Sequence, residues 1–148
     1  MIYKCSLVNK SEPPLKVYVQ EDTFKLYLSD VGILTSLLEL NFSDILLNNQ
    51  FMYKGAIAEN YVAQALQTNG ISLYYWNSGN KAEIDFLFNS KDGIIPIEVK
   101  ASDNTKPKSL NVYKEKYNPP YAIRLSTKNF GFANGIKSIP LYATFLIK

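Results

Sequence analysis

The chain has 148 residues, of which 47% are hydrophobic and 20% are charged, values typical of a globular domain and of neither a disordered nor a collagen-like chain. It contains one cysteine and no histidine, which excludes an internal disulfide, a cysteine-cluster zinc site and every catalytic or metal site built on histidine. The net charge of +3 is uneven: residues 1–80 carry 5 basic and 7 acidic side chains, a net of −2, and residues 81–148 carry 11 and 6, a net of +5. A basic C-terminal half is compatible with a phosphate-rich partner and also with a solvated lysine surface.

The start of the chain shows no targeting or membrane signal. The first residues lack the basic-then-apolar pattern of an export signal, and no apolar run approaches the roughly 18 residues of a membrane span. We therefore expect a cytoplasmic protein without a membrane partner, which the single thiol also favours. Ser11-Glu12-Pro13-Pro14 interrupts the chain early. Residues 1–14 are predicted to be an N-terminal arm, the remnant of a missing upstream module, and residues 15–148 to be the domain.

The first part of the domain is predicted to hold two strands and two helices. Alternating apolar residues predict strands over 15–19 and 24–28. Ser29-Asp30 can cap a following helix, and residues 41–53 are expected to be irregular or weakly helical. The apolar stripe of the capped helix is Ile33, Leu34, Leu37 and Leu38. A clearer helix is predicted from Gly55 to Thr68. Its polar face is expected to hold Asn60, Gln64 and Gln67.

The second part of the domain is rich in predicted strands. They are expected over 72–77, 81–88, 94–100, 122–125 and 139–147. A short helix is expected over 108–116. The order of these elements predicts an α/β (α+β) fold with one central mixed β-sheet flanked by helices.

Two neighbouring predicted strands carry the candidate chemistry. Because side chains alternate between the faces of a strand, Glu98 and Lys100 share one face, and Glu83 and Asp85 share a face of the preceding strand. If the strands pair with their apolar faces together, three carboxylates and one ammonium gather on one side. Crowded carboxylates repel one another, and a divalent cation such as Mg²⁺ would relieve that repulsion. Glu59, at the edge of the apolar stripe of the clearer helix, can lean toward the same place.

This set has the parts that phosphodiester hydrolysis requires. A metal held by carboxylates polarises the phosphate, and a neighbouring lysine orients or deprotonates the attacking water or stabilises the charged transition state. The same pattern also fits a solvent-facing strand, in which Glu98 and Lys100 form an exposed ion pair of little energetic worth. Spacing alone leaves both interpretations open.

The run Glu83-Ile84-Asp85-Phe86, followed by Ile97-Glu98-Val99-Lys100, resembles the PD-(D/E)xK nuclease superfamily, which has the restriction-endonuclease-like fold. The resemblance implies that Asp85, Glu98 and Lys100 are catalytic, with Glu59 as a further acid from the upstream helix. It also implies that Asp85 and Glu98 bind Mg²⁺ or Mn²⁺ with help from Glu59, and that Glu83 supports this set or adds a ligand. Ile84 stands where the superfamily usually has proline, a departure that many members share.

A second resemblance covers nearly the whole chain. Six phrases occur in the order found in the uncharacterised C-terminal domain of a prokaryotic AAA-type ATPase family, over residues 24–34, 55–62, 74–76, 95–100, 108–110 and 139–142. The resemblance implies a nuclease-like fold and an ATPase module in cis. Nothing in the sequence matches a phosphate-binding loop, so no ATP site is expected in this fragment.

Three functions follow as hypotheses. The first is a metal-dependent nuclease domain acting on DNA or RNA. The second is a catalytically inactive nucleic-acid or protein interaction module that targets or couples the ATPase. The third is a structural coupling domain within an ATPase oligomer, with residues 24–38 as its interface. The second hypothesis assigns phosphate contacts to five lysines, Lys106, Lys108, Lys114, Lys116 and Lys128.

Overall fold

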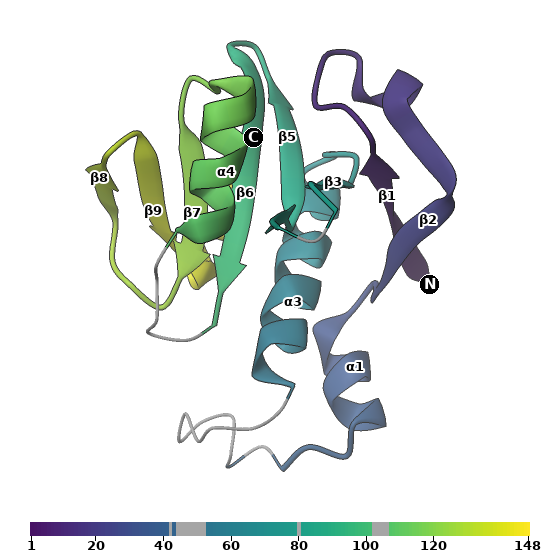
Figure 1. Ribbon diagram of the computed structural model, residues 1–148. Helices are drawn as coiled ribbons and strands as arrows, with labels where there is room; N and C mark the ends of the chain where they lie inside the picture. The colour runs from purple at the N-terminus through teal and green to yellow at the C-terminus, as the bar shows by residue number, and fades with distance from the viewer. Residues whose placement is uncertain (42, 44–52, 80, 102–106) are drawn as a thin grey trace.

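The strands of this protein are divided between two sheets. The computed structural model of the chain describes residues 1–41, 43, 53–79, 81–101 and 107–148. Within these residues one sheet has the order β2-β1-β3-β4 and the other the order β5-β6-β7-β9-β8 (Figure 1). The mixed α/β class agrees with the sequence prediction, but two mixed sheets replace the one central sheet. The predicted irregular stretch over 41–53 falls almost wholly outside the described residues.

The first sheet is built around the N-terminal strand. Its members are β1 (Ile2–Val8), β2 (Val19–Leu28), β3 (Tyr74–Asn77) and β4 (Glu83–Ile84). β1 pairs antiparallel with β2 and parallel with β3, and it buries Cys5, Leu7 and Val8. Cys5 and Leu7 are two residues apart, the period of a strand with one buried face. The segment predicted to be an arm therefore supplies a strand to the middle of a sheet, and its origin in an upstream module stays a prediction.

The second sheet has a parallel centre and antiparallel edges. Its members are β5 (Phe86–Ser90), β6 (Gly93–Lys100), β7 (Ala122–Ser126), β8 (Gly131–Ala133) and β9 (Ile136–Pro140). β6, β7 and β9 run parallel, whereas β5 and β8 are antiparallel to their neighbours. Parallel strands are covered on both faces, and β6 is accordingly buried at every position between its two end residues.

The predicted helices are present. They are α1 (Val31–Leu37), α3 (Lys54–Thr68) and α4 (Lys108–Tyr117), with two 3₁₀ turns, η1 (Leu15–Tyr18) and η2 (Leu141–Leu146). The Asp30 carboxylate caps α1 as expected, because it accepts the N–H groups of Gly32 and Ile33 at 2.6 and 3.2 Å. None of the described helices has both the length and the apolar character needed to cross a bilayer.

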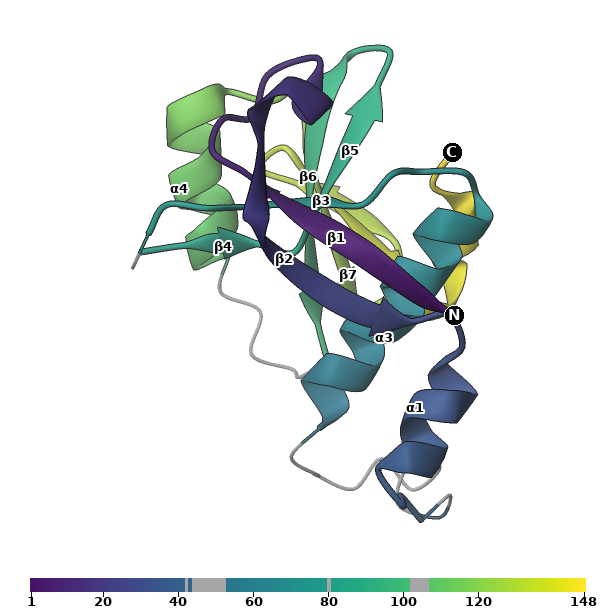
Figure 2. The same ribbon diagram turned by 90° about the vertical axis from the view of Figure 1, so that its right-hand side faces the viewer.

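The hydrophobic core lies on both faces of the second sheet. On one face Val62 of α3 belongs to a cluster with Ile97 of β6, and on the other Tyr113 of α4 belongs to a cluster with Ile94. Both clusters continue into the first sheet; Trp76 of β3, for example, packs with the α4 cluster. α3 contacts strands of both sheets, as the two views in Figures 1 and 2 show.

Two predicted strands are replaced in part by 3₁₀ turns. Residues 15–18 form η1, because Pro14 accepts the Val17 N–H at 3.1 Å in a tight turn and Val17 is 72% exposed instead of alternating with a buried neighbour. Residues 139–147 do not form one strand. β9 ends at Pro140, which lacks the N–H needed to continue a ladder, and η2 follows.

Two predicted helix faces also differ. Asn60, expected on the polar face of α3, is buried, because its side chain both accepts the Leu28 N–H at 2.8 Å and donates to the Leu28 carbonyl at 3.0 Å. The stripe predicted for α1 is only partly covered within the described residues: Leu34 and Leu38 are half-buried, whereas Ile33 is 49% exposed and Leu37 71% exposed.

Candidate functional site

Asp85 stands at the point where the chain leaves one sheet for the other. Before it, Ile84 of β4 pairs with Trp76 in the first sheet; after it, Phe86 of β5 pairs with Ile97 in the second. The Asp85 side chain accepts the Val99 N–H at 2.7 Å. β5 begins at Phe86, opposite Ile97, so no residue of β5 pairs with Val99. The Asp85 carboxylate accepts the Val99 N–H in place of a strand partner.

Burial is the main influence on the charge of Asp85. The side chain is 9% exposed, and desolvation, reinforced by the negative charge of Glu59, raises its pKa to about 7. The hydrogen bond from Val99 and the positive charges of Lys25 and Lys100 oppose this rise in pKa. Asp85 therefore changes its charge near neutral pH.

Glu98 and Lys100 are close to each other, as the alternation predicts. Glu98 is 2% exposed, and its Oε1 lies 3.3 Å from the Lys100 Nζ. Its Oε2 lies 3.9 Å from Nε of Arg124, which is the register partner of Glu98 on β7. The prediction of an exposed ion pair is wrong for Glu98, which lies in the interior between two cations.

Glu59 and Glu83 are joined by a lysine. The Lys25 Nζ lies 2.5 Å from Oε1 of Glu83 and 3.7 Å from Oε2 of Glu59, and the Tyr27 hydroxyl donates to Glu59 at 3.1 Å. Burial lowers the pKa of Lys25, but its hydrogen bond to Glu83 and the charges of three nearby carboxylates outweigh that effect. The net pKa is raised, so Lys25 stays charged and holds the two glutamates.

The four predicted carboxylates do not gather around one point. Asp85 is within electrostatic reach of Glu59 and Lys100, whereas Glu83 is bound to Lys25 and Glu98 lies between Lys100 and Arg124. Among the described residues no group of three or more acidic or cysteine side chains is arranged to hold a metal ion. Metal binding by Asp85, Glu98, Glu59 and Glu83 stays a prediction.

The described lysines that are predicted to contact phosphate lie on α4 and in the loop after β7. Lys108 is exposed at the start of α4, and Lys128 is exposed in the loop after β7. The Lys114 Nζ donates to the Asn134 carbonyl at 2.5 Å, and the Lys116 Nζ lies 5.4 Å from the centre of the Trp76 ring. Lys106 lies outside the described residues.

Two charged residues of this region escaped the sequence analysis. Lys25 lies on β2, whereas the acids that it binds lie on α3 and β4, so only the folded arrangement of these elements brings the three side chains together. Arg124 could have been identified from the sequence. It is the only arginine of the chain and stands alone among apolar residues in a predicted buried strand, where a charge requires a partner or a ligand.

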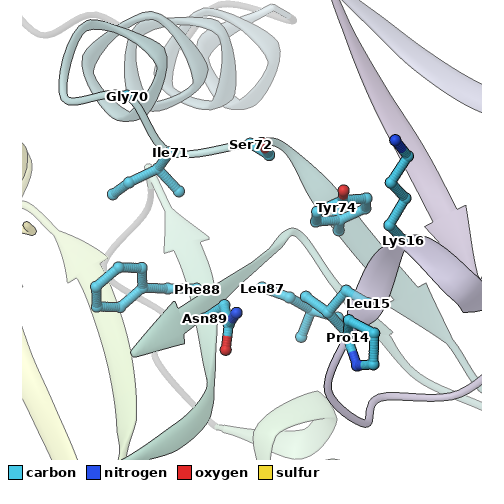
Figure 3. Close-up of a pocket in the computed structure, with 10 residues that line it drawn as sticks. All are labelled: Pro14, Leu15, Lys16, Gly70, Ile71, Ser72, Tyr74, Leu87, Phe88 and Asn89. Carbon is cyan, nitrogen blue, oxygen red and sulfur yellow. The ribbon is translucent and has the colours of Figure 1, made fainter. Parts of the chain in front are cut away.

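A separate cavity of about 320 Å³ lies away from these groups. Its walls come from η1, the segment before β3 and the strand β5 (Figure 3). Lys16 is the one charged residue among the described residues that line it, and none of the predicted site residues is present. This cavity therefore offers no acid or metal chemistry.

Residues 54–144 match the family model of the Domain of unknown function (DUF4143), over more than half of the chain. The chain belongs to this family. DUF4143 is an uncharacterised domain family often found with AAA ATPases. This match confirms the expected resemblance to an uncharacterised domain of an AAA-type ATPase family. The DUF4143 match covers every predicted acid, Lys100 and Arg124, but not Lys25. Neither the curated proteins nor the solved structures gave a match.

Proposed function

We propose that this DUF4143 domain is a metal-dependent phosphodiesterase that cleaves DNA or RNA. The observation that supports the proposal most is the hydrogen bond from the Val99 N–H to Asp85, because Val99 lies between Glu98 and Lys100. This bond holds the aspartate beside the Glu-x-Lys run, at the end of β6. Two acids and a lysine at one strand end are the groups that metal-assisted hydrolysis uses.

Asp85 and Glu98 would hold Mg²⁺ or Mn²⁺, with Glu59 in support. Burial, followed by the negative charge of Glu59, raises the pKa of Asp85, and a bound cation would stabilise its charged form against both effects. Oε2 of Glu98 is buried and has no hydrogen-bond partner among the described residues. Since Mg²⁺ is usually held by one or two carboxylates together with waters and phosphate oxygens, two protein ligands are enough. Glu83 stays bound to Lys25 in this assignment.

Lys100 is the chain's own catalytic group in this proposal. The bound metal would supply polarisation of the phosphate and a water of lowered pKa. The Lys100 ammonium is partly exposed and 3.3 Å from Glu98, so it can orient the attacking water or stabilise negative charge in the transition state. Lys25 and Tyr27 hold Glu59 in place beside Asp85.

The test is cleavage of single- and double-stranded DNA and RNA with Mg²⁺ and with Mn²⁺. Lys100→Ala should lower the cleavage rate by about 100-fold or more, as loss of a transition-state charge contact does. Lys91→Ala, which removes an exposed ammonium from the β5–β6 turn, should leave it unchanged. Equal cleavage by Lys100→Ala and the wild type rejects the role of Lys100, and no cleavage of any of these substrates by the wild type rejects the proposal.

The ion pairs favour a second function, an inactive module that binds nucleic acid or protein and targets an ATPase in cis. Each of Glu59, Glu83 and Glu98 lies next to at least one cation without any metal. In this function Lys108, Lys114, Lys116 and Lys128 contact phosphates, and DNA binding in a metal chelator should weaken between about 50 and 200 mM salt. Binding that salt does not weaken rejects this electrostatic version.

A further inference from the structure

A cavity on the α4 side of the second sheet carries chemistry that the proposed hydrolysis does not use. Its volume is about 290 Å³, just under the range of roughly 300–1,000 Å³ usual for small-ligand pockets. The N-terminal end of α4, β7 and the β8–β9 hairpin surround it. Among the described residues that line it, Arg124 is the charged one and none is acidic.

The strand register places Arg124 in the middle of a polar row. Its partner on β6 is Glu98 and its partner on β9 is Ser138, which also lines the cavity. The Arg124 Nε is 3.9 Å from Glu98 Oε2, beyond hydrogen-bond distance. Nε and Nη2 are both buried, and neither has a hydrogen-bond partner among the described residues. Unpartnered N–H groups in an interior are rare unless a water or a ligand supplies the acceptor.

The surroundings of Arg124 favour an anion. Glu98 is shared between Arg124 and Lys100, so it neutralises at most one of these two charges. The ammonium of Lys114 donates to the carbonyl of Asn134, one of the residues that line the cavity. Asn111, in the first turn of α4, lines the cavity, so the positive end of the helix dipole borders it.

We infer that this cavity is a phosphate-binding site in which the Arg124 guanidinium donates to phosphate oxygens, with Asn111 and Ser138 as further polar contacts. The planar guanidinium matches two oxygens of a phosphate at once, which a lysine ammonium does not. The phosphate belongs to a nucleic-acid strand or to a free nucleotide. None of Asp85, Glu98, Lys100 and Glu59 lines the cavity, and Glu98 contacts Arg124 from outside it, so phosphate binding is testable apart from the proposed hydrolysis.

The single arginine makes the test direct. In a ¹⁵N-labelled sample the chain gives one arginine Nε–H signal, which belongs to Arg124. Titration with inorganic phosphate should move this signal in a saturable way, and chloride at equal ionic strength should not. A signal that moves equally with both salts, or with neither, overturns the proposal.

Substitutions test the same site by phosphate affinity. Arg124→Gln should weaken phosphate binding by about tenfold or more, the usual loss for charged hydrogen bonds. Arg124→Lys should lose most of the same affinity while keeping the charge. Lys91→Gln, which removes a charge elsewhere, should bind as the wild type does; equal weakening in all three variants overturns a specific site.

Two further ligands separate the sources of the phosphate. Adenosine monophosphate and a short single-stranded oligonucleotide are titrated against the same arginine signal. Tighter binding of the oligonucleotide assigns the site to a nucleic-acid strand, and equal or tighter binding of the nucleotide assigns it to a free nucleotide. Failure of both to move the signal overturns the proposal, whatever the outcome of the cleavage assays.

Discussion

At the scale of single residues, Asp85 should make the stability of the domain depend on pH. Its pKa is raised from 3.8 to about 7 in the folded protein, first by burial and then by Glu59. The folded state therefore binds this proton more tightly than the unfolded chain, and the free energy of unfolding falls as pH rises from about 4 to about 7. The loss is on the order of 4 kcal/mol for a shift of this size. Urea unfolding at several pH values measures it.

The matched variants are Asp85→Asn, which keeps an acceptor for Val99, and Asp92→Asn, which changes an exposed turn residue. Asp85→Asn should flatten the pH profile and be the more stable protein above pH 7, whereas Asp92→Asn should follow the wild type. Profiles of the wild type and Asp85→Asn that run parallel would show that Asp85 is not the titrating group.

The residue scale also shows how far sequence patterns reach. Alternation along one strand decides which side chains share a face, and it correctly placed Glu98 beside Lys100. It does not say which strands are neighbours. Arg124 meets Glu98 through the parallel register of β6 and β7, and Lys25 meets Glu83 through the first sheet. These long-range partners follow from topology, which local spacing does not determine.

At the scale of elements, Asn60 should fasten α3 to the end of β2. Its amide satisfies both backbone groups of Leu28, and Asn60→Ala would leave a buried donor and acceptor without partners. The expected loss is about 1–3 kcal/mol in the free energy of unfolding, measured by urea titration. Asn9→Ala, at an exposed position, should change stability little. Equal effects of the two substitutions would mean that the Leu28 contacts are not stabilising.

The elements themselves were predicted better than their assembly. Helical periodicity and the Asp30 cap identified α1, α3 and α4, because these signals are local. The single strand predicted over 81–88 is instead divided at Asp85, since Ile84 pairs with Trp76 while Phe86 pairs with Ile97. Each half has a suitable strand pattern, so only the choice of partners separates them.

At the scale of the whole molecule, the two sheets should unfold together. Trp76, the only tryptophan, lies in the first sheet, and its ring centre is 5.3 Å from that of Tyr113 and 5.6 Å from that of Tyr117, both on α4. Its fluorescence therefore reports contact between the first sheet and α4, the helix that packs on the second sheet. Unfolding midpoints from fluorescence and far-ultraviolet circular dichroism should coincide. An earlier transition in one signal would show that the sheets unfold separately.

Cooperation between the sheets bears on where the domain begins. Deleting residues 1–14 would remove β1 from between β2 and β3, with three buried apolar side chains, each worth about 1.5–3 kcal/mol. That loss approaches the total stability of about 5–15 kcal/mol of an ordinary domain, so the shortened chain should not fold. Leu7→Ala should cost about 2–5 kcal/mol and leave a measurable transition, whereas the exposed Ile2→Ala should cost much less. A shortened chain with an unchanged midpoint would support residue 14 as the domain boundary.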